Sequence, residues 1–384
     1  MTSFKNIGMC ITTCILVVSV AHAELTPQET LGKFLYFDEN LSEPNGQSCA
    51  SCHTPDAGWA DPDRDLPVSE GVIPGLYGDR NSPSASYASL FPDFNYSNGV
   101  ATGGQFWDGR AINVADQATN PFLNPVEMAN PDKETVIRDV LNSNYVDLYE
   151  EICGHTKGDV DASFWCVAEA IGAYESSSEL QKFNSKFDLV MEGKAQFTPL
   201  ERQGFRLFNR KGKCSQCHTS GRGNGRSRFN RTNKLIFTDF KYHNLGLPRN
   251  TVFPYTLMPE DTIDLGLGVT VGDASQNGKF KTPHLRNIAL TPPYMHSGVL
   301  KTLKDVVHFY NTRDVPSAGW NPPEVRENME LRLLGNLGLT DQEEDAIVAF
   351  MLTLTDDYNA SINSKTTNVN KGRGRGRGRG RGQR

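Results

Sequence analysis

The cysteines and histidines of this chain occur twice in one reactive arrangement, Cys-x-x-Cys-His. The two motifs consist of Cys49, Cys52 and His53, and of Cys214, Cys217 and His218. In such a motif the two thiols add to the vinyl groups of a haem, and the adjacent histidine binds one axial face of its iron. A zinc site would need further Cys or His ligands at comparable spacing, and a thioredoxin-like pair would not need the histidine. We therefore expect two covalently attached c-type haems.

The sixth ligand of each iron decides whether such a protein carries electrons or catalyses a reaction. The remaining candidates are His155, His243, His284, Met295, His296 and His308. The stretch from His53 to Trp107 contains no further histidine and no methionine. The first haem therefore has no sixth ligand nearby in sequence, and we expect it to be five-coordinate and open to a small substrate such as peroxide.

Residues 1–23 have the pattern of a secretory signal peptide. Lys5 is followed by an apolar run over residues 9–20 and by a small-x-small cleavage site, AHA, at residues 21–23. The apolar run is too short to span a membrane comfortably. We therefore expect cleavage after Ala23 and a periplasmic protein.

Cleavage would leave one pair of cysteines outside the two haem motifs, Cys153 and Cys166. In an oxidising compartment a disulfide between them is the simplest expectation. Two free thiols are the alternative.

Charge is unevenly distributed along the chain. The segment KGRGRGRGRGRGQR at residues 371–384 holds basic residues and no acidic ones, whereas the rest of the chain is acidic. A repeat of arginine and glycine cannot bury apolar surface, so we expect residues 358–384 to be a disordered tail. An electrostatic tether is the alternative to a solvated tail without a role, and we expect no nucleic-acid partner.

Signals for the start of a helix recur ahead of both haem motifs. TPQE at residues 26–29 and TPLE at residues 198–201 each place threonine as N-cap, proline at the first helical position and glutamate in the first turn. Helical apolar spacing predicts a further helix over residues 161–183, and a capping box at residues 340–343 predicts another. The repeat predicts two small helical units in a loop-rich chain, at residues 24–190 and 191–357.

Longer motifs lie between and beyond the haem motifs. They are GQFWDGR at residues 104–110, NPVEM at 124–128, YHNLGL at 242–247, KTPHLRNI at 281–288 and TPPYMHSG at 291–298. In these motifs the chain resembles the bacterial dihaem cytochrome c peroxidases and their MauG and MbnH relatives, over nearly the whole mature chain except the tail. The resemblance implies an all-α fold of two cytochrome c-type domains, each holding one haem.

The resemblance also implies roles for three further side chains. Glu127 and Gln117 would line the open face of the first haem, where a carboxylate can take a proton from peroxide and return it to the leaving oxygen. Trp107 would lie between the two haems and shorten each step of electron transfer. From the residues alone, a surface glutamate, a helix-face amide and a core tryptophan would be the simpler explanations.

Members of this family hold a calcium ion between the haems, through an asparagine side chain and backbone carbonyls. The matching residues here are Asn81, Thr291 and Pro293. Oxygen ligands of this kind suit calcium. A purely turn-forming Asn81 is the alternative.

The sixth ligand of the second haem separates two branches of the family. The peroxidases place a methionine fourteen residues after the histidine of a Tyr-x-His-x-Gly segment, here His296, whereas MauG and MbnH place a tyrosine there. This chain has Tyr310 at that position. A soft thioether stabilises Fe(II), whereas a phenolate is a hard anion that stabilises Fe(III) and makes Fe(IV) reachable. His308 and Met295 are the rival ligands, and His296 is expected to hydrogen-bond near the second haem.

By this resemblance the chain is an enzyme that uses hydrogen peroxide to form a high-valent dihaem state, which oxidises a tryptophan of a partner protein. The peroxidases also carry a distal histidine that blocks the first haem until reduction, and none occurs between His53 and Asn81. The alternatives are a cytochrome c peroxidase that takes electrons from a small redox protein, and a non-enzymatic dihaem electron carrier. MauG passes electrons through a surface tryptophan just ahead of its second haem motif. Lys211-Gly212-Lys213 stand there instead, so the exit route for electrons differs.

Overall fold

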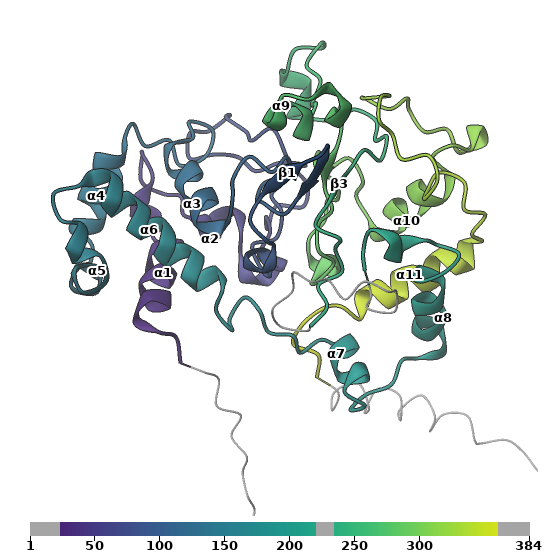
Figure 1. Cartoon of the computed structure of the whole chain (residues 1–384), viewed down its shortest axis with the longest axis horizontal. Helices are drawn as coiled ribbons and strands as arrows, with labels where there is room; N and C mark the ends of the chain where they lie inside the picture. Colours follow the sequence, from purple (N-terminus) through teal and green to yellow (C-terminus); the bar gives the residue numbers. More distant parts are fainter. Residues whose placement is uncertain (1–23, 220–233, 360–384) are drawn as a thin grey trace, which may run out of the picture.

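Helices joined by long loops make up most of the protein (Figure 1). The computed structural model describes residues 24–219 and 234–359, so the predicted signal peptide and nearly all of the predicted tail lie outside the described residues. The helices are α1 (Pro27–Phe37), α2 (Cys49–Cys52), α3 (Val114–Leu123), α4 (Lys133–Leu141), α5 (Val146–Cys153), α6 (Val160–Glu175), α7 (Lys186–Met191), α8 (Pro199–Phe208), α9 (Leu267–Val271), α10 (Leu303–Thr312) and α11 (Asp341–Leu352).

One short hairpin and one further pair of short antiparallel strands accompany the helices, so the fold is mainly helical and departs from the all-α expectation. β1 (Asn95–Ser97) pairs with β2 (Val100–Thr102), and β3 (Tyr242–His243) pairs with β4 (Phe280–Lys281). The turn between β1 and β2 is Asn98-Gly99, and both residues have positive φ angles, 52° and 74°. An Asn-Gly pair is the strongest short-range sequence signal of a hairpin, because both residues readily adopt a positive φ.

One pair of crossing helices frames each half of the protein. α1 packs on α6 in the first half, and α8 packs on α11 in the second. A Cβ atom on Gly32 would lie 1.8 Å from the carbonyl oxygen of Ala170, and a Cβ atom on Gly204 would lie 1.7 Å from that of Ala346. Glycine at these two positions therefore allows the backbones to touch where the helices cross.

The predicted helix starts are confirmed. Capping boxes begin α1, α8 and α11 at Thr26, Thr198 and Thr340. The helix predicted over residues 161–183 instead ends at Glu175. Three serines follow, and the hydroxyl of Ser176 donates a hydrogen bond to the Gly172 carbonyl at 2.8 Å. Such local side-chain bonds compete with the continuing helix.

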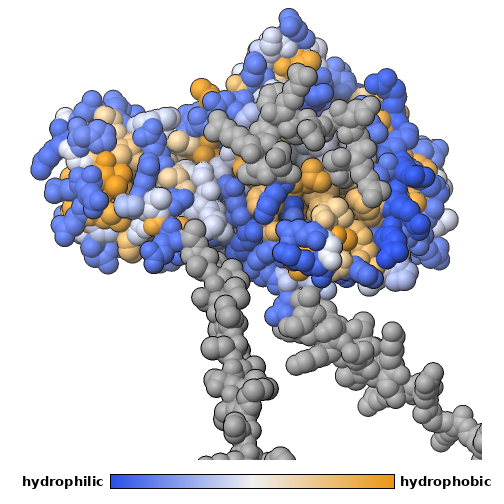
Figure 2. Space-filling view, turned by 60° about the horizontal axis from the view of Figure 1, so that its bottom comes forward, coloured by the Kyte–Doolittle hydropathy of each residue, from blue (hydrophilic) through white to orange (hydrophobic). Residues whose placement is uncertain are grey.

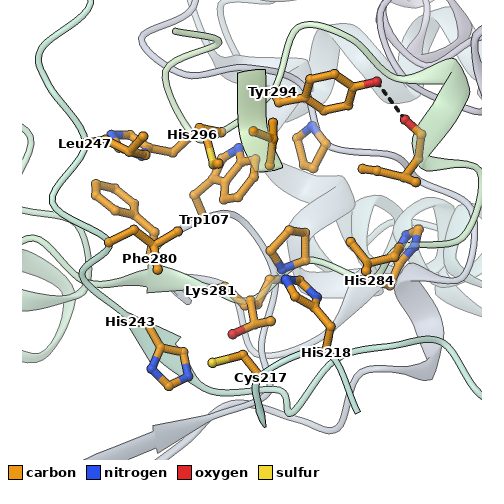
Figure 3. A pocket seen from close by; sticks show the side chains of 18 of the residues that line it. Trp107, Cys217, His218, His243, Leu247, Phe280, Lys281, His284, Tyr294 and His296 are labelled. Carbon is orange, nitrogen blue, oxygen red and sulfur yellow. Dashed lines mark hydrogen bonds between the residues drawn. The ribbon is translucent and has the colours of Figure 1, made fainter. Parts of the chain in front are cut away.

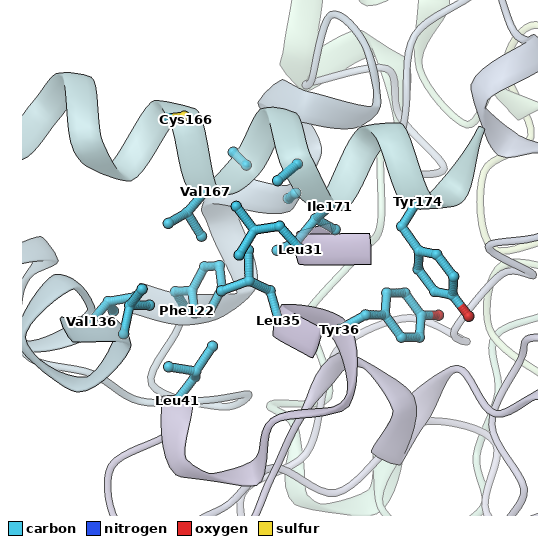
Figure 4. Close-up of a cluster of buried hydrophobic side chains, with 14 of the residues drawn as sticks. Leu31, Leu35, Tyr36, Leu41, Phe122, Val136, Cys166, Val167, Ile171 and Tyr174 are labelled. Carbon is cyan, nitrogen blue, oxygen red and sulfur yellow. The ribbon is translucent and has the colours of Figure 1, made fainter. Parts of the chain in front are cut away.

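The buried apolar side chains gather in two main clusters. The first takes its buried members from residues 31–180, and Figure 4 shows its centre, where Leu31 and Leu35 of α1 meet Val167 and Ile171 of α6. The second takes its buried members from residues 187–354 and surrounds α8, α10 and α11. Each half thus has its own core, consistent with two helical units of similar construction.

The two halves are joined by backbone hydrogen bonds between loops. The Asn81 N–H donates to the His296 carbonyl, the Gly103 N–H to the Phe240 carbonyl and the Lys281 N–H to the Trp107 carbonyl, each at 2.8 Å. In Figure 1, β1 and β3 lie along this junction, with the helices of the two halves on either side. The junction therefore holds the segment around Trp107 against the second half.

The face seen in Figure 2 is largely hydrophilic, with apolar areas in separate patches. No helix within residues 24–219 and 234–359 is long and apolar enough to cross a membrane.

Cys153, at the end of α5, and Cys166, in α6, form a disulfide with a Cα–Cα distance of 5.9 Å.

Candidate haem sites

Both haem motifs present their histidine in the same way. His53 follows α2, and its Nδ1 lies 3.3 Å from the Trp59 carbonyl oxygen. His218 lies in the second motif, and its Nδ1 is 3.0 Å from the Phe237 carbonyl oxygen. A bond from Nδ1–H to a backbone carbonyl fixes the tautomer and leaves Nε2 free to bind a metal. Burial lowers the pKa of both imidazoles, which keeps them in the neutral form that a metal requires.

The second motif opens into a large cavity that suits a haem. Its wall includes Cys214, Cys217, His218 and Tyr310. Figure 3 shows Cys217 and His218 on one side of this cavity, with Trp107 and His296 also in its wall. The residues of the second motif therefore fit a covalently attached haem.

Tyr310 and His308, the rival ligands on α10, lie in different surroundings. Tyr310 lines the cavity of the second motif, and its hydroxyl has no hydrogen-bond partner among the described residues. The His308 side chain is 46% exposed, and its Nδ1 lies 3.0 Å from a carboxylate oxygen of Glu344. Glu344 also accepts a hydrogen bond from Asn311 at 2.7 Å. Glu344 thus ties α10 to α11, with Tyr310 directed inward and His308 outward.

The other candidate ligands are also placed. His155 is exposed, and His243 lies 3.0 Å from the Asp239 carboxylate, which raises the imidazole pKa to about 10 although burial opposes the charged form. Met295 and His284 line the cavity of the second motif. His296 lines it too, stacked on Phe280 with ring centroids 3.5 Å apart.

Glu127 lines a cavity in the first half of the protein. Asn124 donates a hydrogen bond of 2.9 Å to Glu127 Oε1, and the other carboxylate oxygen has no hydrogen-bond partner among the described residues. Burial raises the pKa of the Cys49 and Cys52 thiols most, and the charge of Glu127 is one of the smaller effects in the same direction. Burial also raises the pKa of Glu127 itself. A carboxyl group with a raised pKa at a cavity is suited to proton transfer.

The cavity beside Glu127 has a volume of about 550 Å³. Its wall is made of Phe106, Arg110, Thr119, Asn120, Leu123, Asn124, Glu127, Lys133, Asp161, Phe164 and Trp165. Gln117 lies on α3, one turn before Asn120. It is half-buried and does not belong to this wall. The structure therefore places Glu127 at a cavity but does not bring Gln117 into the same wall.

Trp107 lies at the junction of the two halves and lines the cavity of the second motif (Figure 3). Its indole N–H donates a hydrogen bond of 2.8 Å to the carbonyl of Asn81. The neighbouring Asp108 accepts a hydrogen bond of 2.6 Å from Arg80, which also pairs with Asp264 at 2.7 Å. The indole is thus fixed in place from both halves.

Asn81, Thr291 and Pro293 all line this same cavity. The side-chain N–H of Asn81 donates to the Pro67 carbonyl at 3.0 Å. That bond uses the nitrogen end of the amide and leaves Oδ1 as an acceptor. An exposed amide oxygen of this kind is a suitable calcium ligand.

Comparison with known proteins agrees with this geometry. Residues 26–196 match the model of a family described as di-haem cytochrome c peroxidase. The chain is 41% identical over 350 residues to the methylamine utilization protein MauG of Paracoccus denitrificans, covering 85% of this chain and 88% of that protein. The chain belongs to the di-haem cytochrome c peroxidase family. As a member, it is a dihaem peroxidase-type oxidoreductase.

Other members cover similar lengths. The cytochrome c551 peroxidase of Pseudomonas aeruginosa is 32% identical over 289 residues, covering 73% of this chain and 70% of that protein. The crystal structure of the diheme peroxidase BthA from Burkholderia thailandensis superimposes with a TM-score of 0.76 at 32% identity and covers 87% of each chain. The fold is therefore that of the dihaem peroxidases.

Pro121 of this dihaem peroxidase was not among the site residues predicted from the sequence. α3 and α10 begin alike, because Asn113 and Thr302 each cap the helix by accepting the N–H of an aspartate three residues on. Eight residues after the cap, α10 carries Tyr310, whereas α3 carries Pro121. Proline has no side-chain atom that can bind a metal. The two cap patterns, N-x-x-D and T-x-x-D, were the signal that could have aligned these positions.

Proposed function

We propose that this protein is a periplasmic MauG-like enzyme that uses hydrogen peroxide to oxidise a tryptophan of a partner protein. The observation that carries the proposal is Tyr310, which lines the same cavity as His218. The similarity to MauG over most of the chain supports it. A periplasmic location rests on the signal-peptide pattern of residues 1–23.

Tyr310 argues against the supply of electrons by a small cytochrome. A phenolate stabilises Fe(III) against Fe(II), so an iron held by His218 and Tyr310 would accept an electron less readily than one held by a thioether. His308 cannot take the place of Tyr310 without breaking its contact with Glu344. The second site is thus suited to holding an oxidising equivalent.

The first site is suited to meeting peroxide. When bound, the first haem supplies the metal on which peroxide is activated. Pro121 occupies the position on α3 that Tyr310 occupies on α10 and offers no ligand. Glu127 has one carboxylate oxygen held by Asn124 and the other unpaired, so the unpaired oxygen can accept the peroxide proton and return it to the departing oxygen.

Further parts of the proposal concern cofactors. We expect two covalent haems, at the two Cys-x-x-Cys-His motifs, and a calcium ion at Asn81, Thr291 and Pro293. The free Oδ1 of Asn81 supports the calcium site. Trp107, held between the two halves, is expected to carry electrons between the two haem sites.

The proposal is tested by adding one equivalent of hydrogen peroxide to the fully oxidised holoprotein and recording its optical spectrum. We expect an immediate reaction without prior reduction, and an oxidised state that persists for minutes. An oxidised protein that stays inert until one haem is reduced, and then rapidly oxidises reduced cytochrome c, would contradict the proposal. The Tyr310→Met variant should move toward that second behaviour.

A further inference from the structure

A run of touching aromatic rings leads from Tyr310 to the protein surface. The ring centroids of Tyr310 and Phe309 are 6.3 Å apart, and those of Phe309 and Trp320 are 5.2 Å apart in an edge-on contact. Phe309 is fully buried, and Trp320 is half-buried in the loop after α10. Beyond Trp320 lies the outward-facing ring of His308, at 6.0 Å. The run therefore joins the second haem cavity to solvent through continuous protein.

Trp320 is the member of this run that can give up an electron at the surface. Indole is among the most easily oxidised side chains, whereas phenylalanine resists oxidation and acts here as a dry bridge. The Trp320 indole N–H donates a hydrogen bond of 3.0 Å to the Thr312 hydroxyl. That hydroxyl donates in turn to the His308 carbonyl at 2.7 Å. These two bonds fix the orientation of the indole against α10.

The segment ahead of the second haem motif offers no such route. Residues 209–219 contain no aromatic ring apart from the imidazole of His218. Lys211 pairs with Glu343, and Lys213 donates to the Arg332 carbonyl. Electrons that approach the second cavity from this side would meet charged side chains rather than an oxidisable one.

Trp165 is the rival surface tryptophan. It lies on α6 in the first half and is 42% exposed. Its indole N–H donates to Glu169 at 2.9 Å, and among the described residues it makes no ring contact with another aromatic side chain. It borders the cavity of Glu127. Exposure alone would favour Trp165, whereas connection to Tyr310 favours Trp320.

We propose that Trp320 is the residue through which electrons enter the protein from an external, electron-rich aromatic side chain. This inference rests on the proposed function and names its point of contact with substrate. Each hydrogen peroxide takes two electrons and two protons to form two water molecules. The two electrons pass one at a time from the partner's ring through Trp320 and Phe309 toward Tyr310, and the partner's ring releases the two protons. Trp320 is left unchanged after each transfer.

Without a partner, Trp320 itself becomes the electron donor. Its indole adds one water molecule and gives up two electrons and two protons in total, and these reduce the peroxide to two water molecules. The net reaction is tryptophan and hydrogen peroxide to hydroxytryptophan and water. Oxygen added to Trp320 in the absence of a partner therefore shows that electrons leave through this residue.

The experiment treats the oxidised holoprotein with a few equivalents of hydrogen peroxide in the absence of any partner. Proteolysis and mass spectrometry then locate added oxygen. We expect the peptide with Trp320 to gain one oxygen atom before the peptide with Trp165 does. In parallel, the optical spectrum follows the decay of the oxidised state, which should be several-fold slower in Trp320→Phe than in the wild type. Tyr358→Phe, which removes another oxidisable ring that lines neither cavity, is the control and should decay like the wild type.

Trp320→Phe keeps a ring against Phe309, so the variant retains the packing of the second core. Oxidation of Trp165 ahead of Trp320, or decay in Trp320→Phe at the wild-type rate, would overturn the inference and leave the proposed function intact. A wild-type protein whose spectrum does not respond to peroxide at all would overturn both.

Discussion

At the scale of single residues, the chemistry depends on which way neighbouring side chains point. Tyr310 and His308 stand two positions apart on α10, so they face different sides of the helix. Glu344 holds His308 at the surface by a contact of 3.0 Å. Tyr310 is therefore the side chain that points inward, and it lines the cavity of the second motif. A buried carboxylate thus helps to decide which side chain can reach the iron.

Glu127→Gln is the residue-scale prediction. Loss of the proton-accepting group should slow the reaction with peroxide by about 100- to 10,000-fold. Burial raises the pKa of Glu127, and the active form is the carboxylate. The wild-type rate should therefore fall as the pH is lowered through this raised pKa, and the variant should lose that dependence. Rapid-mixing spectroscopy across a pH series measures both.

Glu134→Gln, at an exposed glutamate on α4, serves as the control and should react with peroxide at the wild-type rate. If Glu127→Gln keeps both the rate and the pH dependence of the wild type, Glu127 does not handle the proton.

At this scale the sequence predicted more through motifs than through spacing. The motifs singled out Cys214, His218 and Glu127, and the structure has these residues in cavity walls, because each belongs to a short local pattern. The pairing of His308 with Glu344 bridges 36 residues, and nothing in the local pattern of either residue indicates it. Pro121 was missed because its meaning appears only when α3 is aligned with α10.

At the scale of elements, each half depends on one close crossing of helices. The helix starts could be predicted because capping is local, whereas the crossings could not, because Gly32 meets Ala170 far along the chain. The same holds for Gly204 and Ala346. A glycine inside a helix costs about 0.5–1 kcal/mol relative to alanine, so its presence at each crossing needs such a reason.

Gly32→Ala is the element-scale prediction. The new Cβ would lie 1.8 Å from the backbone oxygen of Ala170, and a backbone atom cannot move aside without separating α1 from α6. We expect a loss of about 1–3 kcal/mol in the free energy of unfolding. Chemical denaturation of the holoprotein measures it.

Gly154→Ala is the matched control, because the nearest atom to its new Cβ, the Cβ of Glu150, lies 3.9 Å away. That variant should change stability by less than about 0.5 kcal/mol. Equal effects of the two substitutions would show that the crossing does not require glycine.

At the scale of the whole molecule, two similar halves are locked together and given different sites. Arg80 of the first half pairs with Asp264 of the second at 2.7 Å, and the hydroxyl of Tyr87 of the first half donates to Asp356 at 2.7 Å. These contacts hold the two cavities and Trp107 in one rigid relation. The halves differ at the position eight residues after the cap of α3 and of α10, where the first has Pro121 and the second Tyr310.

The most direct test of this asymmetry is the electron paramagnetic resonance spectrum of the fully oxidised holoprotein. We expect one high-spin ferric signal, from an iron held by His53 with an open face, and one low-spin signal, from an iron held by His218 and Tyr310. Tyr310→Phe should alter the low-spin signal and leave the high-spin one in place. Two low-spin signals in the wild type, or a low-spin signal that Tyr310→Phe leaves unchanged, would contradict the assignment of one open and one tyrosine-closed haem.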